Sequence, residues 1–343
     1  MRELVIREAE AGQRLDKFLR KYMRDAGSGF LYKMLRKKSI LLNRRKAAGS
    51  ELLVPGDRLE LFLSEETLTR FGAPGAEGKS GTASAARTDG AALPSGRKQP
   101  PAVYEDGDVL ILNKPAGMLV QPASGAEPAL SDLLPGWLLS RGAVSREDLR
   151  AVTPAPVNRL DRNTSGLVLC GKTMAGLQYL SQALRTRDLE KRYLALTVPG
   201  SVPDGVYRVY ALKDRCANRM KLSDRPESGA SEMVTGITVL ARSPLCQLVL
   251  VRLITGRTHQ IRAHLAWLGI PIAGDPKYGL RTADAPLTER YRLTRQMLHA
   301  WEVRFPSSAE ITALQGRTFR AGPPADFRRV MNGEELRWPE EGG

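Results

Sequence analysis

A single carboxylate, Asp161, lies between two arginines in the segment 157–167. Pro154 and Pro156 precede the segment and fix an extended chain, and an apolar strand is predicted to follow it, so a loop beside a rigid element should present the acid. Positive neighbours favour the ionised form of a carboxyl group at neutral pH. An ionised carboxylate can act as a nucleophile or a general base. An Asp that only pairs with its arginines and holds the turn would show the same pattern, so both interpretations stay open here.

The motifs of several other chemistries are missing from the sequence. No Gly-rich loop ends in Lys-Ser or Lys-Thr, and no Gly-x-Gly-x-x-Gly opens a helix after a strand, so a nucleotide cofactor has no support. His259 and His264 are five residues apart on a predicted helix and therefore face different directions, which argues against a metal pair. The sequence therefore predicts chemistry with no cofactor and no metal.

Charge points to a polyanionic partner. The 343 residues carry a net charge of +15 at pH 7, and the isoelectric point is about 10.0. Such a field attracts RNA and DNA, although a basic surface can also serve solubility alone. No apolar run approaches the roughly 18 residues that a membrane span needs, and the three cysteines form neither close pairs nor a disulfide pattern. We expect a cytoplasmic, monomeric protein with no membrane contact.

Composition divides the chain into four parts. Residues 64–102 are dominated by small and polar residues that cannot bury enough surface to offset ordering entropy, so they are predicted to be a flexible linker. A small module over 1–63 precedes this linker. A larger domain over 103–305 and a C-terminal extension over 306–343 follow it.

The N-terminal module is predicted to be a small basic α+β fold. Apolar residues at helical spacing indicate one helix from Leu15 to Tyr22 and a second from Phe30, after a break at 27–29. Two short strands begin at Ile40 and Leu59. The module holds 15 Lys and Arg against 8 Asp and Glu, a net charge of +7. The basic side chains of the second helix, above all Lys33, Arg36 and Lys37, could contact phosphates or could simply form a solvated face.

The larger domain shows short strands separated by turns, with few helices. Strands are expected at 109–112, 167–170, 193–198, 237–241 and 248–253, and helices after Thr173 and over 258–268. Regular alternation of strand and helix is missing. The pattern predicts an α+β domain with a mixed, largely antiparallel sheet.

The segment around Asp161, Asn158-Arg159-Leu160-Asp161-Arg162-Asn163-Thr164-Ser165-Gly166, resembles the active-site motif of the RluA family of pseudouridine synthases. Asn158 stands where that motif commonly has His. Three further blocks resemble the family's blocks in the same order: 113–120, 191–195 and 255–262 followed by 274–279. The N-terminal module resembles the alpha-L RNA-binding domain that many members carry.

The resemblance implies roles for the site residues. Asp161 would be the catalytic carboxylate, either attacking the anomeric carbon or removing a ribose proton, and Arg262 would keep it charged and oriented. Tyr193 would stack on a uracil flipped out of the RNA. Arg159 would fill the space that the base leaves. Lys114 and Arg257 would contact phosphates.

The implied substrate is structured RNA. The N-terminal module favours large-subunit ribosomal RNA over transfer RNA. A ribosome-assembly protein that keeps the fold without catalysis would predict a degraded Asp or Tyr block, and both blocks are intact. A methyltransferase would need a Gly-rich pocket for its methyl donor, and no such segment is present.

Overall fold

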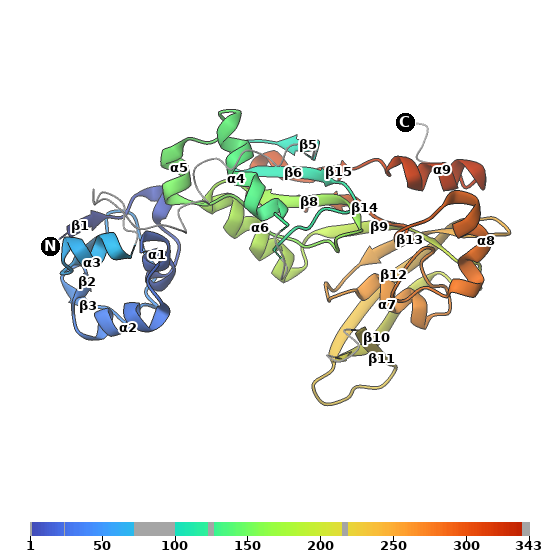
Figure 1. The fold of residues 1–343 in the computed structure, drawn as a ribbon, viewed down its shortest axis with the longest axis horizontal. Helices are drawn as coiled ribbons and strands as arrows, with labels where there is room; N and C mark the ends of the chain where they lie inside the picture. Colours follow the sequence, from blue (N-terminus) through green and yellow to red (C-terminus); the bar gives the residue numbers. More distant parts are fainter. Residues whose placement is uncertain (1, 24, 72–99, 123–126, 215–218, 338–343) are drawn as a thin grey trace. The chain divides into compact units, whose positions relative to one another are not determined.

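The computed structural model of the protein describes residues 2–23, 25–71, 100–122, 127–214 and 219–337 (Figure 1). The chain forms two compact units. The smaller unit contains Met1–Ala92 and Pro135–Thr153, and the larger unit contains Leu93–Leu134 and Pro154–Gly343. In the described ranges, no helix is long and apolar enough to cross a membrane.

The smaller unit packs helices against a four-stranded antiparallel sheet of order β1-β4-β2-β3. Its strands are β1 (Arg2–Val5), β2 (Ile40–Leu42), β3 (Arg45–Lys46) and β4 (Arg58–Leu61). Its helical segments are η1 (Glu8–Glu10), α1 (Leu15–Tyr22), α2 (Ser28–Arg36), α3 (Glu65–Arg70) and α5 (Arg146–Ala151). The two helices and two strands expected here are therefore confirmed.

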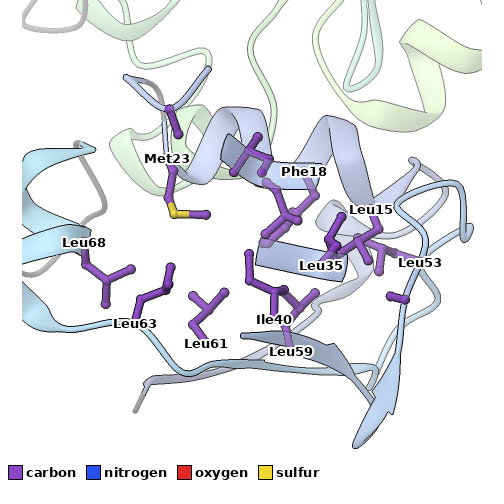
Figure 2. Close-up of a cluster of buried hydrophobic side chains, with 14 of the residues drawn as sticks. Leu15, Phe18, Met23, Leu35, Ile40, Leu53, Leu59, Leu61, Leu63 and Leu68 are labelled. Carbon is purple, nitrogen blue, oxygen red and sulfur yellow. The ribbon is translucent and has the colours of Figure 1, made fainter. Parts of the chain in front are cut away.

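Figure 2 shows the core of this unit, where leucines from both helices and sheet point toward one another. Leu15 and Leu19 of α1 and Leu59 and Leu61 of β4 are fully buried. Each such side chain contributes about 1.5 to 3 kcal/mol relative to an exposed one. The apolar spacing that predicted the helices therefore also supplied their buried face.

The second helix starts earlier than expected. Gly27 is the residue before its first turn, and Ser28 and Gly29 are helical rather than part of a break. Glycine costs little in a first turn, because the amides there need no partner within the helix.

Part of the predicted linker is folded. Residues 65–70 form α3, whose Leu68 is fully buried in the core of the smaller unit. Phe71 packs on Phe30, with ring centroids 4.3 Å apart. The prediction of a linker over 64–102 is therefore wrong for residues 65–71, and residues 72–99 lie outside the described part of the chain.

The larger unit is built on one long sheet. Its strand order is β11-β10-β12-β13-β9-β14-β8-β6-β5, with β15 beside β14 and β7 beside β8. Among the described strands, β14 and β8 are the one parallel pair. The expected mixed and largely antiparallel α+β fold is confirmed.

The five strands and two helices expected in the larger unit are present, and several further elements, among them β10, β11 and β14, were not expected. Its strands are β5 (Ala102–Glu105), β6 (Val109–Lys114), β7 (Ala155–Pro156), β8 (Ser165–Gly171), β9 (Glu190–Thr197), β10 (Gly205–Asp214), β11 (Arg219–Ser223), β12 (Ser231–Arg242), β13 (Gln247–Leu253), β14 (Leu298–Arg304) and β15 (Thr318–Arg320). Its helical segments are α6 (Met174–Thr186), α7 (Gln260–Trp267), α8 (Arg281–Tyr291), η2 (Thr312–Leu314) and α9 (Ala325–Gly333). Helix α4 (Leu130–Ser140) contains the boundary between the two units, which falls between Leu134 and Pro135.

Glycines allow the close approaches that bring the site elements together. Gly166 has φ +111°, and a Cβ there would lie 2.1 Å from the carbonyl oxygen of Ala300 on β14. A side chain at this position would therefore separate β8 from β14 immediately after the Asp161 loop. Thr173 caps α6 by accepting a hydrogen bond from the Gly176 amide at 3.1 Å, as predicted.

Residues 306–337, predicted as an extension, are packed into the larger unit. Strand β15 pairs with β14, and Phe327 and Val330 of α9 are fully buried. Arg295 and Asp326 form a two-bond ion pair, at 2.7 and 2.8 Å. The boundary expected at 305 therefore does not separate two compact units.

Candidate active site

A cavity of about 930 Å³ lies in the larger unit, within the size range of ligand pockets. It brings together five of the expected site residues, which come from three separate segments: Arg159, Asp161, Tyr193, Arg257 and Arg262.

The Asp161 loop joins β7 to β8 and is fixed by its own backbone. The Thr164 amide donates to the carbonyl of Asp161 at 3.0 Å, and the Gly117 amide donates to the carbonyl of Arg162 at 2.8 Å. The side chain of Asp161 is 30% exposed. Its carboxylate is therefore held by rigid backbone and can be reached from the cavity.

Asn158, at the position where the family motif commonly has His, ties the start of this loop to β8. Its side-chain nitrogen donates to the carbonyl of Leu167 at 3.3 Å, and its oxygen accepts from the Leu169 amide at 2.8 Å. The amide group satisfies a donor and an acceptor of the neighbouring strand at once. The unusual residue thus has a clear structural role.

Arg262 on α7 connects two carboxylates. Its Nη1 donates to Asp161 Oδ2 at 2.7 Å, while Nε and Nη2 donate to the two oxygens of Asp275 at 2.7 and 2.8 Å. Asp275 also accepts from the amides of Lys277 and Tyr278. Burial raises the pKa of Asp275, but the bonds from Arg262 and these amides outweigh it and hold the pKa below its ordinary value. The guanidinium therefore keeps one orientation, with one nitrogen directed at Asp161.

Tyr193 lies on β9, between Val251 of β13 and Ala300 of β14 in the sheet register, and lines the cavity while only 6% exposed. Burial first, and the charge of Asp161 second, raise the pKa of Tyr193. The phenol is therefore neutral at pH 7. A buried ring at a cavity wall, next to a carboxylate, can stack on a planar neutral base.

The chain is 33% identical over 311 residues to a ribosomal large subunit pseudouridine synthase C of Vibrio vulnificus (strain CMCP6), with 89% of this chain and 88% of that protein covered. It belongs to the RNA pseudouridylate synthase family. The chain is also 32% identical over 327 residues to the protein of the same name from Escherichia coli (strain K12), with 89% of each covered. The RluA resemblance drawn from the sequence blocks is confirmed, and the chain is an isomerase that forms pseudouridine.

Two further comparisons concern the family and the fold, in that order. The model of the family described as RNA pseudouridylate synthase matches residues 108–267. The human RNA pseudouridylate synthase domain containing 4 has a similar fold, with a TM-score of 0.55 at 24% identity, covering 70% of this chain and 94% of that one.

One expected RNA contact in this pseudouridine synthase is wrong. Lys114 is fully buried and does not line the cavity. Its ammonium donates to the carbonyls of Pro115, Met118 and Arg162 at 2.8, 2.9 and 3.1 Å. Three donors thus meet three acceptors, and one of these belongs to the residue after Asp161. Lys114 therefore binds the backbone of the Asp161 loop and is not available to a phosphate.

Tyr278, in the block 274–279, supports Arg262, a role that the sequence did not predict. Its ring packs against the Arg262 guanidinium, with 5.4 Å from Cζ to the ring centroid. Its hydroxyl accepts from the Met220 amide of β11 at 2.9 Å and lies 3.2 Å from His259 Nδ1. Tyr278 therefore packs on a face of the Arg262 guanidinium. The spacing of residues along the sequence could not reveal this contact.

Gln260 positions Arg257 through a buried network that sequence reasoning also missed. Its side-chain oxygen accepts from Thr255 Oγ1 at 2.8 Å and from the Arg257 amide at 3.1 Å. Its nitrogen donates to Val234 and Thr235 of β12, both at 3.0 Å. The turn before α7 is thereby attached to the sheet, and the exposed Arg257 side chain is presented at the cavity.

More cations line the cavity than the sequence analysis named. Besides Arg159, Arg257 and Arg262, five Lys or Arg residues contribute to it: Arg162, Arg185, Arg187, Lys191 and Lys277. Basic residues at the end of a predicted helix, at 185–187, were a signal that could have drawn attention to this region.

The expected phosphate contacts of the N-terminal module are at the surface. Lys33 and Arg36 of α2 and Lys37 just after it are all exposed. They belong to the smaller unit, and their binding to RNA stays a prediction.

Within the described residues, no group of three or more His, Cys, Asp or Glu side chains is arranged to hold a metal ion. His259 lines the cavity, whereas His264 is buried against Thr235. The two histidines therefore have separate surroundings.

Proposed function

We propose that this enzyme isomerises uridines of large-subunit ribosomal RNA and that Asp161 is its catalytic carboxylate. The observation that carries the proposal is the contact of Asp161 with Arg262 in a cavity that Tyr193 also lines and whose other described charged residues are all basic. Both relatives described above are named for the large ribosomal subunit.

The reaction breaks the bond from ribose C1′ to uracil N1, turns the base and joins C1′ to C5. The proton of C5 leaves and N1 gains one, so atoms balance without an oxidant or a second substrate. Asp161 would act on the ribose by attacking C1′ or by removing a ribose proton, and the arrangement is compatible with either route. Arg262 would hold the carboxylate ionised and aimed.

Binding requires the nucleotide to leave its helix, because the base edge and ribose cannot reach the carboxylate inside a stacked duplex. Tyr193 would support the flipped uracil, and stacking of this kind contributes about 1 to 3 kcal/mol. Exposed Arg159 and Arg257 would contact the RNA at the cavity.

The test is formation of pseudouridine by purified enzyme on unmodified large-subunit ribosomal RNA and, separately, on transfer RNA, measured as release of the C5 proton. We expect product on ribosomal RNA, and Asp161→Asn should abolish it while RNA affinity changes less than about tenfold, or 1.4 kcal/mol. Near-normal turnover by Asp161→Asn would end the assignment of the carboxylate. Product on transfer RNA alone would move the target.

A pseudouridine map of total RNA with and without the gene would identify the uridines. The monomeric state, the cytoplasmic location and the lack of a cofactor remain predictions.

A further inference from the structure

Several cations that line the cavity form no ion pair with a described residue, and Arg187 and Lys191 are two neighbouring ones among them. Arg262 is paired with Asp161 and Asp275, and Arg162 is paired with Glu127. In the described part of the chain, neither Arg187 nor Lys191 forms an ion pair, although both line the cavity. Asp161 is the one acidic residue among the described residues of the lining.

The two side chains also repel each other. Lys191 is partly buried, and burial first, followed by the charge of Arg187, lowers its pKa. Arg187 is exposed and Lys191 is half-buried, and two like charges held close together remain unfavourable unless an anion joins them. A bound anion would attract both side chains and so offset the repulsion between them and the burial of the Lys191 charge.

The backbone places this pair beside the base site. Lys191 and Tyr193 are two residues apart on β9, so their side chains lie on the same face of the sheet. Arg187 ends α6 with φ +65° and ψ +29°, a left-handed conformation in which glycine or asparagine is the usual residue. An arginine there costs on the order of 1 kcal/mol relative to glycine, and Arg292 ends α8 in the same conformation, so the backbone fixes where the Arg187 side chain begins but does not by itself assign its role.

We propose that Arg187 and Lys191 form a binding site for a backbone phosphate of the RNA strand, next to the uridine that stacks on Tyr193. This inference rests on the proposed function and adds the path of the strand across the cavity wall. The chemistry fits a phosphodiester, because the guanidinium offers paired donors to phosphate oxygens and the ammonium adds a point charge. The contact fixes the position of the strand and carries no sequence information.

The test uses the full-length enzyme and unmodified large-subunit ribosomal RNA made by transcription. Binding is measured at several salt concentrations for the wild type, Arg187→Asn, Lys191→Met and the control Arg304→Gln. Asparagine suits the left-handed backbone, and methionine fills the space of the lysine stem without its charge. Arg304 is an exposed arginine of β14 outside the cavity, so its variant removes one charge from the same unit.

We expect Arg187→Asn and Lys191→Met to weaken RNA binding roughly tenfold and to lower the magnitude of the salt slope by roughly 0.7 each. Both should keep or raise the unfolding temperature, so weaker binding could not come from damage to the fold. The control should bind with the wild-type slope. Slopes of both variants equal to that of Arg304→Gln would overturn the phosphate site.

The two proposals fail in different ways. If wild type and Arg304→Gln form no pseudouridine in ribosomal RNA, the proposed function is wrong. If they form it and the slopes of the two cavity variants are unchanged, the function stands and the phosphate site is wrong.

Discussion

Arg262 donates two hydrogen bonds to Asp275, of 2.7 and 2.8 Å, through Nε and Nη2. This pairing directs the remaining nitrogen, Nη1, at Asp161. Asp275 itself is fully buried at its side chain and bound by two backbone amides. A fully buried carboxylate thus determines where the guanidinium points. The orientation of Arg262 toward Asp161 therefore depends on Asp275.

Asp275→Asn should slow the chemical step. An amide offers one acceptor oxygen, so Arg262 loses one of its two anchoring bonds and can turn away from Asp161. Misplacement of about 1 Å at a reacting group can lower rates about a hundredfold. We expect a fall of this order in the single-turnover rate at saturating RNA, with little change in affinity. A rate equal to that of the wild type would show that the second bond between Arg262 and residue 275 is not needed to direct the guanidinium at Asp161.

Tyr193 variants separate stacking from the hydroxyl. Binding is measured in the Asp161→Asn background, so that no product forms. Tyr193→Phe should keep affinity, and Tyr193→Leu, which fills similar space without a ring, should lose about 1 to 3 kcal/mol. Because Tyr193 is only 6% exposed, an alanine there would also leave a destabilising cavity, and leucine is the better comparison. Equal affinity of the Phe and Leu variants would exclude stacking.

Lys114→Met should lower stability without changing the salt slope of RNA binding, because the ammonium serves three carbonyls and no phosphate. Burial first, and Arg295 second, lower the pKa of Lys114 to about 7 from an ordinary 10.5. Between these values the unfolded chain holds a proton that the folded chain has released, which leaves an amine with two N–H donors near the three carbonyls. This group therefore makes folding more favourable as pH rises from about 7 to about 10.

Lys114→Met has no titrating group at this position and so lacks this pH-dependent contribution to the free energy of unfolding. The difference in unfolding free energy between wild type and Lys114→Met should therefore grow with pH across this window. A constant difference would show that Lys114 keeps its ordinary pKa.

Asp326 on α9 is predicted to act on the catalytic loop through Arg295. Arg295 is bound by both oxygens of Asp326 and donates to the carbonyl of Asn163, two residues after Asp161, at 3.2 Å. Asp326→Asn should therefore lower the turnover number about tenfold, with the Michaelis constant for RNA nearly unchanged.

Glu334→Gln is the matched control for that prediction. Glu334 also lies in the C-terminal segment and binds Arg290 and Tyr291, but it does not contact the catalytic loop. Both variants should lower the unfolding temperature, and only Asp326→Asn should lower turnover. An equal effect of the two on turnover would reduce Asp326 to a purely structural residue.

The basic face of α2 is predicted to supply affinity rather than chemistry. Changing Lys33, Arg36 and Lys37 together to Gln keeps the buried face of the helix, which Leu31 and Leu35 provide. Loss of three phosphate contacts should lower the magnitude of the salt slope by roughly 2 and raise the Michaelis constant. Turnover at saturating RNA should change much less. Substitution is preferable to deleting 1–63, because residues 135–153 belong to the same compact unit.

The sequence was informative where a residue's neighbours along the chain decide its role. The family blocks identified Asp161, Tyr193 and Arg262, and the structure brings all three to one cavity. Apolar spacing found α1, α6 and the central strands, because the periodicity of burial is written directly in the residues.

The errors arose where distant segments decide the role. A lysine at the end of a strand usually reaches water, and the carbonyls that bury Lys114 come from 115, 118 and 162. The pairing of Arg295 with Asp326 and the stacking of Tyr278 on Arg262 depend on folding and leave no local pattern. Strands β10 and β11 were missed because their faces carry mixed polar residues rather than a clean alternation.

The distance along the chain between the members of the site has a consequence during synthesis. Asp161 and Arg262 are 101 residues apart in the sequence. Arg295 binds Asn163, which lies 132 residues before it, and Asp326, which lies 31 residues after it. Contacts of such separation form slowly, and a chain made from its N-terminus cannot complete them until α9 has emerged from the ribosome. The smaller unit is complete once residue 153 has emerged. A nascent chain can therefore expose a folded basic surface well before it possesses a working catalytic site.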